Sequence, residues 1–191
     1  MLYGGLPFRE LENKFLMAPP CEVTPFTDAA FPGEVEIIPL PGHFFDMVGF
    51  RTPDDVVYLA DCLSGAETLD KYQIGFIYDV RAYLETLDKI DTLQAAMFVP
   101  SHAEAAEDIR GLSDVNRRKV LTIAEKLAGI CKTPASFENI LQKIFTDYGL
   151  VMNFEQYVLV GNAIKSYLAY LRDSGKVDIT YVDNMMLWVK I

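Results

Sequence analysis

The segment LPGHFFDMVGFRTPDDVVYLADCL, residues 40–63, carries most of the information about the fold of this chain. It begins with a Pro-Gly turn that leads into His43, and it ends with Asp61 after an apolar run. Between them lie two short β-rich runs, residues 47–51 and 56–60, which the turn sequence TPDD separates. The segment therefore predicts a hairpin that is flanked on each side by a side chain able to coordinate a metal ion.

A third candidate ligand lies further along the chain. Residues 95–99 form a short apolar run that Pro100 ends, and His102 follows it. The chain has two histidines, His43 and His102, and each follows a tight turn after a predicted strand. A strand end fixes the backbone while the loop exposes the imidazole, which is how metal ligands are commonly placed. We expect His43, Asp61 and His102 to form a metal site, since a cation would offset the cost of an unpaired carboxylate in apolar surroundings.

The residues around this segment predict further elements. The first third is rich in turn-forming Pro and Gly and is expected to be loop. Residues 34–40 predict a strand before the hairpin, and residues 80–90 have apolar side chains at helical spacing. A helix followed by the strand at 95–99 is the simplest arrangement.

Helical periodicity dominates the C-terminal part of the chain. It predicts helices over residues 115–130 and 137–148, and a third that Asn153 caps and that continues through 163–171. The runs 177–182 and 185–189, joined by Asp-Asn, predict a β-hairpin. Three helices followed by a hairpin is the element order of a winged helix.

Composition and charge limit the classes of function. An apolar content of 51% supports a globular core, and three cysteines with no C-x-x-C spacing favour neither a disulfide framework nor a zinc ribbon. No apolar run approaches the length of a membrane span, so we expect a soluble cytoplasmic protein with no membrane partner. Residues 1–108 hold 6 Lys and Arg against 19 Asp and Glu, a balance of −13, whereas residues 109–191 hold 11 against 8, a balance of +3. The acidic first part disfavours nucleic-acid binding, and the weakly basic second part leaves that question open.

The motifs LPGH at 40–43, ADCL at 60–63 and VPSHAE at 99–104 resemble the last three metal-binding motifs of the metallo-β-lactamase superfamily, in the same order. Residues 15–20 and 79–93 also resemble the interior of such proteins. The helical end is similar to the winged-helix extension of some members.

The resemblance implies a fold, a domain division and a cofactor. The fold class is mixed α/β (α+β): residues 1–108 form the C-terminal half of a metallo-β-lactamase αββα sandwich, and residues 109–191 form a winged-helix-like helical domain. In the complete family site, the residue matching His43 completes the first metal site, that matching Asp61 bridges both metals, and that matching His102 completes the second. The metals expected there are two zinc ions, or iron or manganese.

The chain departs from the family pattern at one decisive point. The H-x-H-x-D-H loop, which supplies further ligands to both metals, is absent from a sequence with two histidines. A catalytic zinc usually has three protein ligands and a water. We therefore expect no metal or one weakly bound ion here, and hydrolysis of an ester, thioester, amide or phosphodiester that is absent or very slow in this chain alone.

Each candidate ligand also has a plainer interpretation. His43 can be a loop histidine bonded to a backbone carbonyl, Asp61 a turn or capping residue, and His102 the cap of a helix that begins near Ala103. The acidic residues after it are then favourable charges on the first helical turn, and they are Glu104, Glu107 and Asp108.

Other side chains have two interpretations as well. Cys62 has no activating group placed beside it by sequence, which favours a buried structural thiol over a nucleophile. Four aromatic residues can line a substrate pocket or belong to the core: Phe44, Phe45, Phe76 and Tyr78. Lys165 and Arg172 are the candidates for phosphate contact on the third predicted helix, and two cations are few for a DNA reader.

Three functions follow from these observations. The first is a portion of a metal-dependent hydrolase of small molecules, truncated or completed by a partner chain. The second is a non-catalytic module for protein interaction or dimerisation, and nucleic-acid binding through the winged helix ranks last. A sheet without its partner sheet exposes an apolar face, so we expect a homo-oligomer, or a separate N-terminal half, to cover it.

Overall fold

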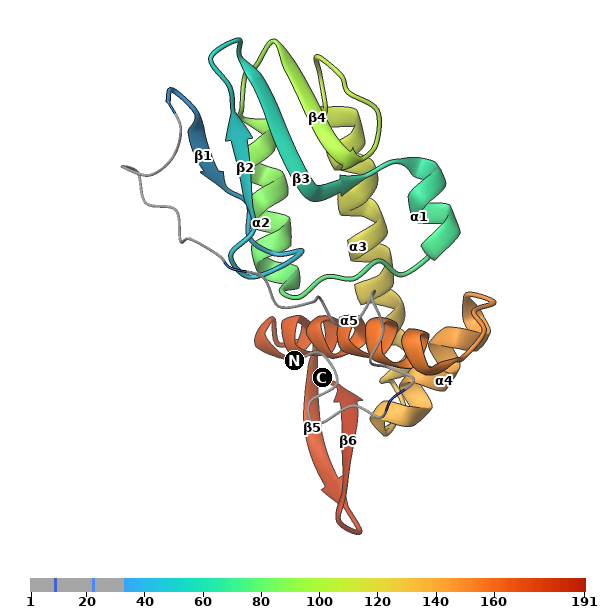
Figure 1. The fold of residues 1–191 in the computed structure, drawn as a ribbon. Coiled ribbons are helices and arrows are strands. Elements are labelled where there is room, and N and C mark those ends of the chain that lie inside the picture. Colours follow the sequence, from blue (N-terminus) through green and yellow to red (C-terminus); the bar gives the residue numbers. More distant parts are fainter. Residues whose placement is uncertain (1–8, 10–21, 23–32) are drawn as a thin grey trace.

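The computed structural model describes residues 9, 22 and 33–191 of the chain (Figure 1). The resemblance noted for residues 15–20, and most of the loop predicted for the first third, fall outside the described residues. None of the described helices combines the length and the apolar character that crossing a membrane requires.

The N-terminal part of the described chain is built on a four-stranded sheet in the order β1-β2-β3-β4. The strands are β1 (Glu36–Pro39), β2 (Val48–Arg51), β3 (Val56–Ser64) and β4 (Met97–His102). The β1–β2 and β2–β3 pairs are antiparallel, and β3 and β4 are parallel. All four predicted strands are confirmed, and the TPDD turn joins β2 to β3 through a hydrogen bond from Asp55 N to Thr52 O of 2.9 Å.

Two strands are longer than predicted. β3 continues past residue 60 to Ser64, and β4 continues through Pro100 to His102. Proline has no N–H to donate to a neighbouring strand. It is tolerated here because β4 is an edge strand of the described sheet.

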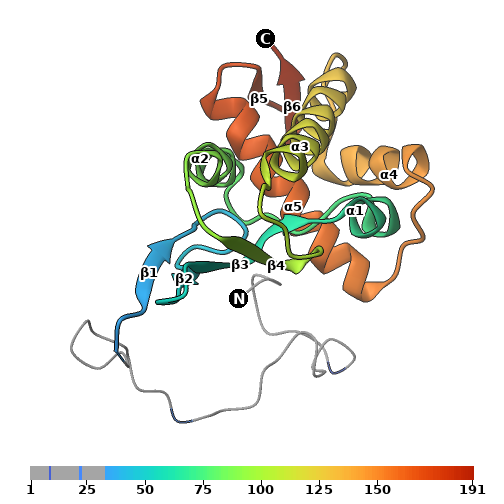
Figure 2. The same ribbon diagram turned by 90° about the horizontal axis from the view of Figure 1, so that it is seen from above.

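Helices cover one face of this sheet (Figure 2). α2 (Val80–Asp91) and α3 (Arg110–Ile130) pack on the face that contains Val57 and Leu59, both fully buried. The helix predicted over residues 80–90 is thereby confirmed. The short α1 (Ala66–Tyr72) was not predicted, because it buries none of its side chains and so lacks an apolar stripe in the sequence.

The C-terminal part contains α4 (Phe137–Asp147), α5 (Phe154–Asp173) and a hairpin of β5 (Val177–Val182) and β6 (Met185–Lys190). These elements confirm the predicted helices and hairpin. The predicted caps are also confirmed, since Ser136 accepts a hydrogen bond from Asn139 N and Asn153 accepts one from Gln156 N. The order of three helices and a hairpin is as expected for a winged helix, while the winged-helix assignment and the division at residue 108 remain predictions.

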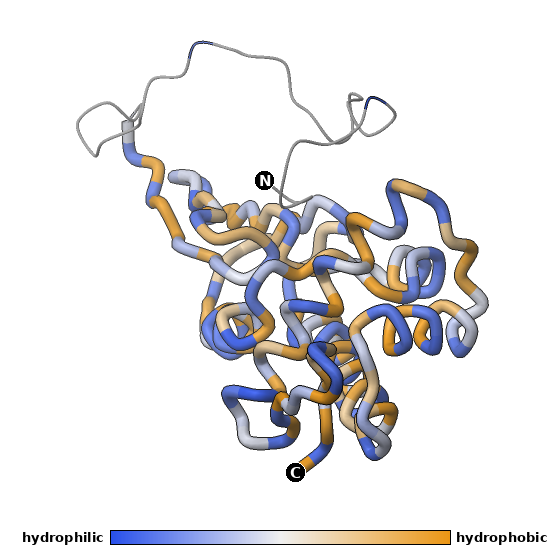
Figure 3. Tube along the Cα trace, turned by 90° about the horizontal axis from the view of Figure 1, so that it is seen from below, coloured by the Kyte–Doolittle hydropathy of each residue, from blue (hydrophilic) through white to orange (hydrophobic). Residues whose placement is uncertain are grey.

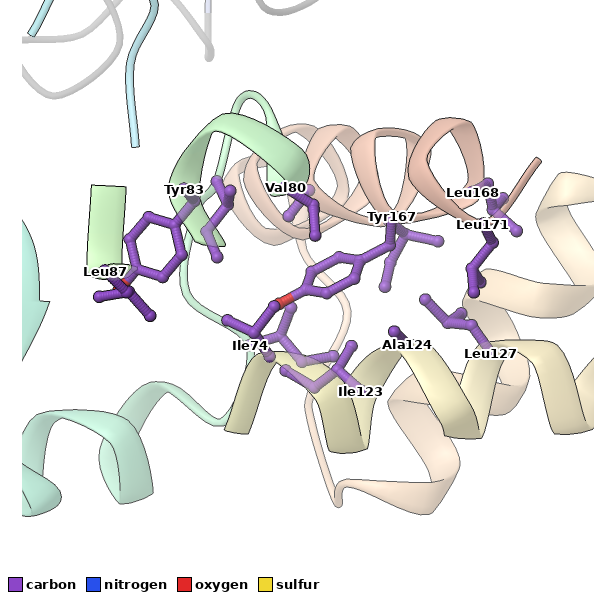
Figure 4. Packing of buried hydrophobic residues seen from close by; sticks show 14 of the residues in the cluster. Ile74, Val80, Tyr83, Leu87, Ile123, Ala124, Leu127, Tyr167, Leu168 and Leu171 are labelled. Atoms are coloured by element: carbon purple, nitrogen blue, oxygen red, sulfur yellow. The ribbon is translucent and has the colours of Figure 1, made fainter. Parts of the chain in front are cut away.

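One core connects the sheet with the C-terminal helices. The buried cluster includes residues of the sheet, α2, α3, α4 and α5. Tyr167 of α5 is 1% exposed, and its ring lies between α5 and α3 and points towards Ile74 and Ile123 (Figure 4). Hydrophobic and hydrophilic residues alternate along the helices and strands (Figure 3), as expected of elements that bury one side.

The opposite face of the sheet is apolar and only partly buried. Register pairing places one residue from each strand in a single row across it: Ile37, Phe50, Tyr58 and Val99. Tyr58 is 46% exposed, and a hollow of about 230 Å³ lies beside it. Among the described residues, the helices α2 and α3 lie on the other face of the sheet (Figure 2).

Candidate functional site

The loop that carries His43 is tied to α2. Thr86 Oγ1 donates to Pro41 O at 2.6 Å, and the backbone N–H of Asp79 donates to Gly42 O at 3.0 Å. Gly42 has φ of +125°, and a Cβ added there would lie 2.3 Å from the backbone of Tyr83. Only glycine permits this approach, so the backbone before His43 is held rigidly against the helix.

Asp61 lies inside β3 and not after it, which corrects the prediction that it follows the strand. The register of β3 against β4 shifts at Ala60, whose φ is +48°. A left-handed alanine inside a strand is strained, and such a bulge redirects the side chains that follow. The sequence pattern could not show it, because the strand continues beyond the irregularity to Ser64.

His102 is the last residue of β4, and it pairs with Ser64 of β3. Its carbonyl accepts a hydrogen bond from Gly65 N at 2.8 Å. The alternative in which His102 caps a helix beginning near Ala103 is wrong, because α3 begins at Arg110.

The acidic residues after His102 therefore do not lie on a first helical turn. They are part of the segment between β4 and α3. Asp108 instead accepts hydrogen bonds from the backbone and the side chain of Arg110, and these hold the pKa of its carboxyl at about 2.

The three predicted ligands come together. His43 Nε2 lies 3.7 Å from Asp61 Oδ2, and His102 Nε2 lies 3.4 Å from Asp61 Oδ1. Each imidazole therefore faces a different oxygen of one carboxylate. The residues are far apart in the sequence, and the hairpin and the parallel β3–β4 pairing bring them to one end of the sheet.

Burial favours the neutral form of His43. Its side chain is 28% exposed, whereas that of His102 is 50% exposed. Burial lowers the pKa of His43 below its ordinary value; the Asp61 carboxylate opposes this effect and His102 adds to it. The lowered pKa favours the neutral imidazole, which has a nitrogen lone pair available.

A buried asparagine holds the end of β3 by hydrogen bonds. Asn116 of α3 is 1% exposed; its Nδ2 donates to Ser64 O at 2.9 Å, and its Oδ1 accepts from Ser64 N at 3.1 Å. The Tyr83 hydroxyl also donates to Asn116 Oδ1 at 3.3 Å. Asn116 therefore links α2, α3 and the strand that carries Asp61. The sequence did contain a signal for it, because Asn116 continues the helical stripe of Val120 and Ile123.

The donor types at this site suit zinc, but the ligand set is incomplete. Two imidazole nitrogens and a carboxylate are ordinary zinc ligands. Over residues 33–191, however, no group of three or more His, Cys, Asp and Glu side chains is arranged to hold a metal ion. The imidazoles lie against the carboxylate and do not surround one common point. The three residues therefore fit part of a metal site that needs further ligands.

Cys62 and the four aromatic candidates differ in their relation to the site. Cys62 is fully buried, and burial raises the pKa of its thiol to about 12, which favours a buried structural thiol over a nucleophile. Phe76 packs edge-on against the His43 ring, with a centroid distance of 5.8 Å. Phe44, Phe45 and Tyr78 instead form an exposed cluster of their own.

The two cations considered for phosphate contact have partners within the protein. Lys165 Nζ lies 5.1 Å from the centroid of the Phe137 ring. Arg172 Nε lies 3.4 Å from Asp178 Oδ1.

Comparison with known proteins gives matches in structure. No family model matches the chain, and no curated protein sequence matches it. A metallo-β-lactamase family protein from Thermus thermophilus has a similar structure, with a TM-score of 0.67 and 17% identity over 91% of this chain and 56% of that one. A β-lactamase domain protein from Burkholderia ambifaria also has a TM-score of 0.67, with 16% identity over 82% of this chain and 47% of that one.

The chain has a partial metallo-β-lactamase fold. The predicted fold class is thus confirmed. The chain spans about half the length of the solved structures it matches. Because 91% of this chain is covered in the first comparison, the likeness extends beyond the sheet into the C-terminal helices.

Proposed function

We propose that this chain contributes one part of the active site of a metal-dependent hydrolase, with His43, Asp61 and His102 as metal ligands. The observation that carries the proposal is the position of Asp61, whose two oxygens each face the Nε2 of a different histidine. A carboxylate in this position can serve two neighbouring metal ions, with one histidine for each. The partial metallo-β-lactamase fold supports the same assignment.

The residues have distinct tasks in this proposal. A metal bound there would supply hydroxide at neutral pH by acidifying its water. The lowered pKa of His43 favours its unprotonated imidazole, and the hydrogen bond from Thr86 of α2 helps to fix the loop on which it lies. The bulge at Ala60 and the bonds from Asn116 direct and hold the strand around Asp61. Because the ligand set is incomplete within the described residues, this chain alone is expected to bind metal weakly and to hydrolyse substrates very slowly or not at all.

Zinc titration of the full chain by calorimetry tests the proposal. We expect saturable binding that weakens by about tenfold or more in Asp61→Asn and in His102→Ala. The matched control is Asp54→Asn in the exposed β2–β3 turn, which should bind zinc as the original chain does. Binding that is absent, or equal in all four proteins, would exclude a metal site at these residues.

We also propose that a second copy of the chain covers the outer face of the sheet. The partly exposed row that contains Ile37, Tyr58 and Val99 supports this, and the same surface serves the second candidate function, a non-catalytic dimerisation module. Light scattering at micromolar concentration should give the mass of a dimer or larger oligomer. Tyr58→Glu should lower that mass, whereas Tyr181→Glu in the β5–β6 hairpin should not. A monomeric original chain would refute this assembly.

A further inference from the structure

A cleft of about 610 Å³ lies beside the two histidines. Its walls come from α1 and from the first half of α5, which lie next to each other in Figure 1. His43 and His102 are among the lining residues, so the cleft opens directly onto the candidate metal ligands. Its volume falls within the range of small-molecule binding sites, roughly 300 to 1,000 Å³.

The walls of the cleft are mainly apolar. α1 contributes Leu69, the segment after α1 contributes Ile74 and Phe76, and α5 contributes Leu159 and Val160. Phe76 also contacts His43 edge-on, so the apolar surface extends up to the histidine. An apolar ligand that fills this cleft removes hydrocarbon surface from water, which favours binding.

Charge distinguishes among the possible ligands. Among the described lining residues, Lys71 is the lone lysine or arginine, and Glu67 from the same helix brings the opposite charge. Binding of a phosphodiester backbone depends on clustered Lys and Arg. The cleft lacks such a cluster within the described part of the chain, and its apolar walls suit a hydrocarbon chain.

We propose that this cleft binds the apolar acyl group of a carboxylic acid derivative. The acyl chain lies between α1 and α5, and its carbonyl carbon lies at the end of the cleft where His43 and His102 are. This assignment rests on the proposed function for the placement of the carbonyl, and it adds the substrate class: an ester or thioester of a medium-length apolar acid, in preference to a phosphodiester.

Binding of octanoate, the acid that such a hydrolysis releases, tests the proposal without metal or turnover. In the presence of a chelator, calorimetry should show saturable binding of octanoate to the full chain, and butyrate should bind about tenfold or more weakly because it buries fewer methylene groups. Absence of saturable octanoate binding, or tighter binding of a ribodinucleotide than of octanoate, would overturn the assignment.

Two substitutions test whether octanoate binds in this cleft. Leu159→Glu puts a charge into the wall, and Leu159→Trp fills the space without one; each should weaken octanoate binding by about tenfold or more. Val151→Glu introduces the same charge at a position that is 81% exposed and outside the cleft, and its affinity should remain that of the original chain. Thermal melting shows whether each variant is folded. Unchanged affinity in a folded Leu159 variant would exclude this cleft as the binding site.

The two histidines allow the orientation to be tested directly. Octanoate should shift the imidazole C–H signals of His43 and His102 in the NMR spectrum, since the cleft ends at these rings. If zinc fails to bind but octanoate binds and shifts these signals, the result supports the acyl cleft and refutes the proposed metal site. If zinc binds and octanoate does not, the result supports the metal site and refutes the acyl cleft.

Discussion

The end of β3 and the start of α5 differ in what determines their structure. At the start of α5, Asn153 accepts a hydrogen bond from Gln156 N at 2.8 Å, three residues further on. At the end of β3, the backbone of Ser64 is bonded to Asn116, which is distant in the sequence, and Ala60 adopts a strained left-handed conformation. Local signals therefore specify the helix, whereas the strand that carries Asp61 depends on contacts with other elements.

This difference has energetic consequences. A helix cap is worth about 1 kcal/mol, and its loss affects one helix end. The contacts around β3 and the His43 loop join α2, α3 and the sheet, so a change there disturbs several elements at once. Substitutions at the site end of the sheet should thus cost more stability than comparable substitutions in the C-terminal helices.

The largest effect is expected from Gly42→Ala. The added Cβ would lie 2.3 Å from the Tyr83 backbone, and φ of +125° is unfavourable for alanine. We expect the free energy of unfolding to fall by roughly 3 kcal/mol or more, as measured by urea denaturation. The control Gly129→Ala, in an open position of α3, should raise it by about 0.5 to 1 kcal/mol. A small loss at position 42 would show that the loop can move away from α2.

Asn116→Ala should have the next largest effect. It leaves the N–H and C=O of Ser64, which is partly buried, without their side-chain partner, at a cost of roughly 1 to 3 kcal/mol. Asn139→Ala, at an exposed position of α4, provides the control and should change stability by less than about 0.5 kcal/mol. Equal effects of the two substitutions would mean that water replaces the Asn116 contacts.

A smaller effect is expected at the start of α5. Asn153→Ala removes the cap and should lower the free energy of unfolding by about 1 kcal/mol. Thr122→Ala on the exposed side of α3 should be close to neutral. If Asn153→Ala were more damaging than Asn116→Ala, the contrast between local and long-range control would be reversed.

The smallest effect is expected at Ala60. Glycine tolerates φ of +48°, so Ala60→Gly relieves strain but adds freedom to the unfolded chain, and the net change should be within about 1 kcal/mol towards greater stability. Ala60→Val should destabilise the protein, because a β-branched residue strongly disfavours this conformation. Equal stability of the two variants in thermal melts would argue against a left-handed residue at this position.

The same contrast explains how much could be predicted from the sequence. The hairpin at β5–β6 was predicted correctly because Asp183 and Asn184, both with positive φ, are residues that favour such a turn. The convergence of His43, Asp61 and His102 followed from the positions of these residues beside strands, although their metal-binding role remains a prediction. The bulge at Ala60 and the start of α3 at Arg110 were not predictable, because both depend on packing between distant segments.

The cleft could not be predicted from the sequence either. Its walls combine α1, whose polar pattern gave no helical signal, with Leu159 and Val160, which looked like ordinary helix positions. Only the folded arrangement places these residues next to the two histidines.

The limited burial of α1 affects how the molecule can evolve. This helix contributes a wall of the cleft, yet none of its side chains is buried, and it lies in the crossover between β3 and β4. Mutations in it can accumulate at little thermodynamic cost, while the strands on either side keep Asp61 and His102 in place. Under the acyl-cleft proposal, ligand preference can therefore change through substitutions in α1 while His43 and His102, at the other end of the cleft, stay in place.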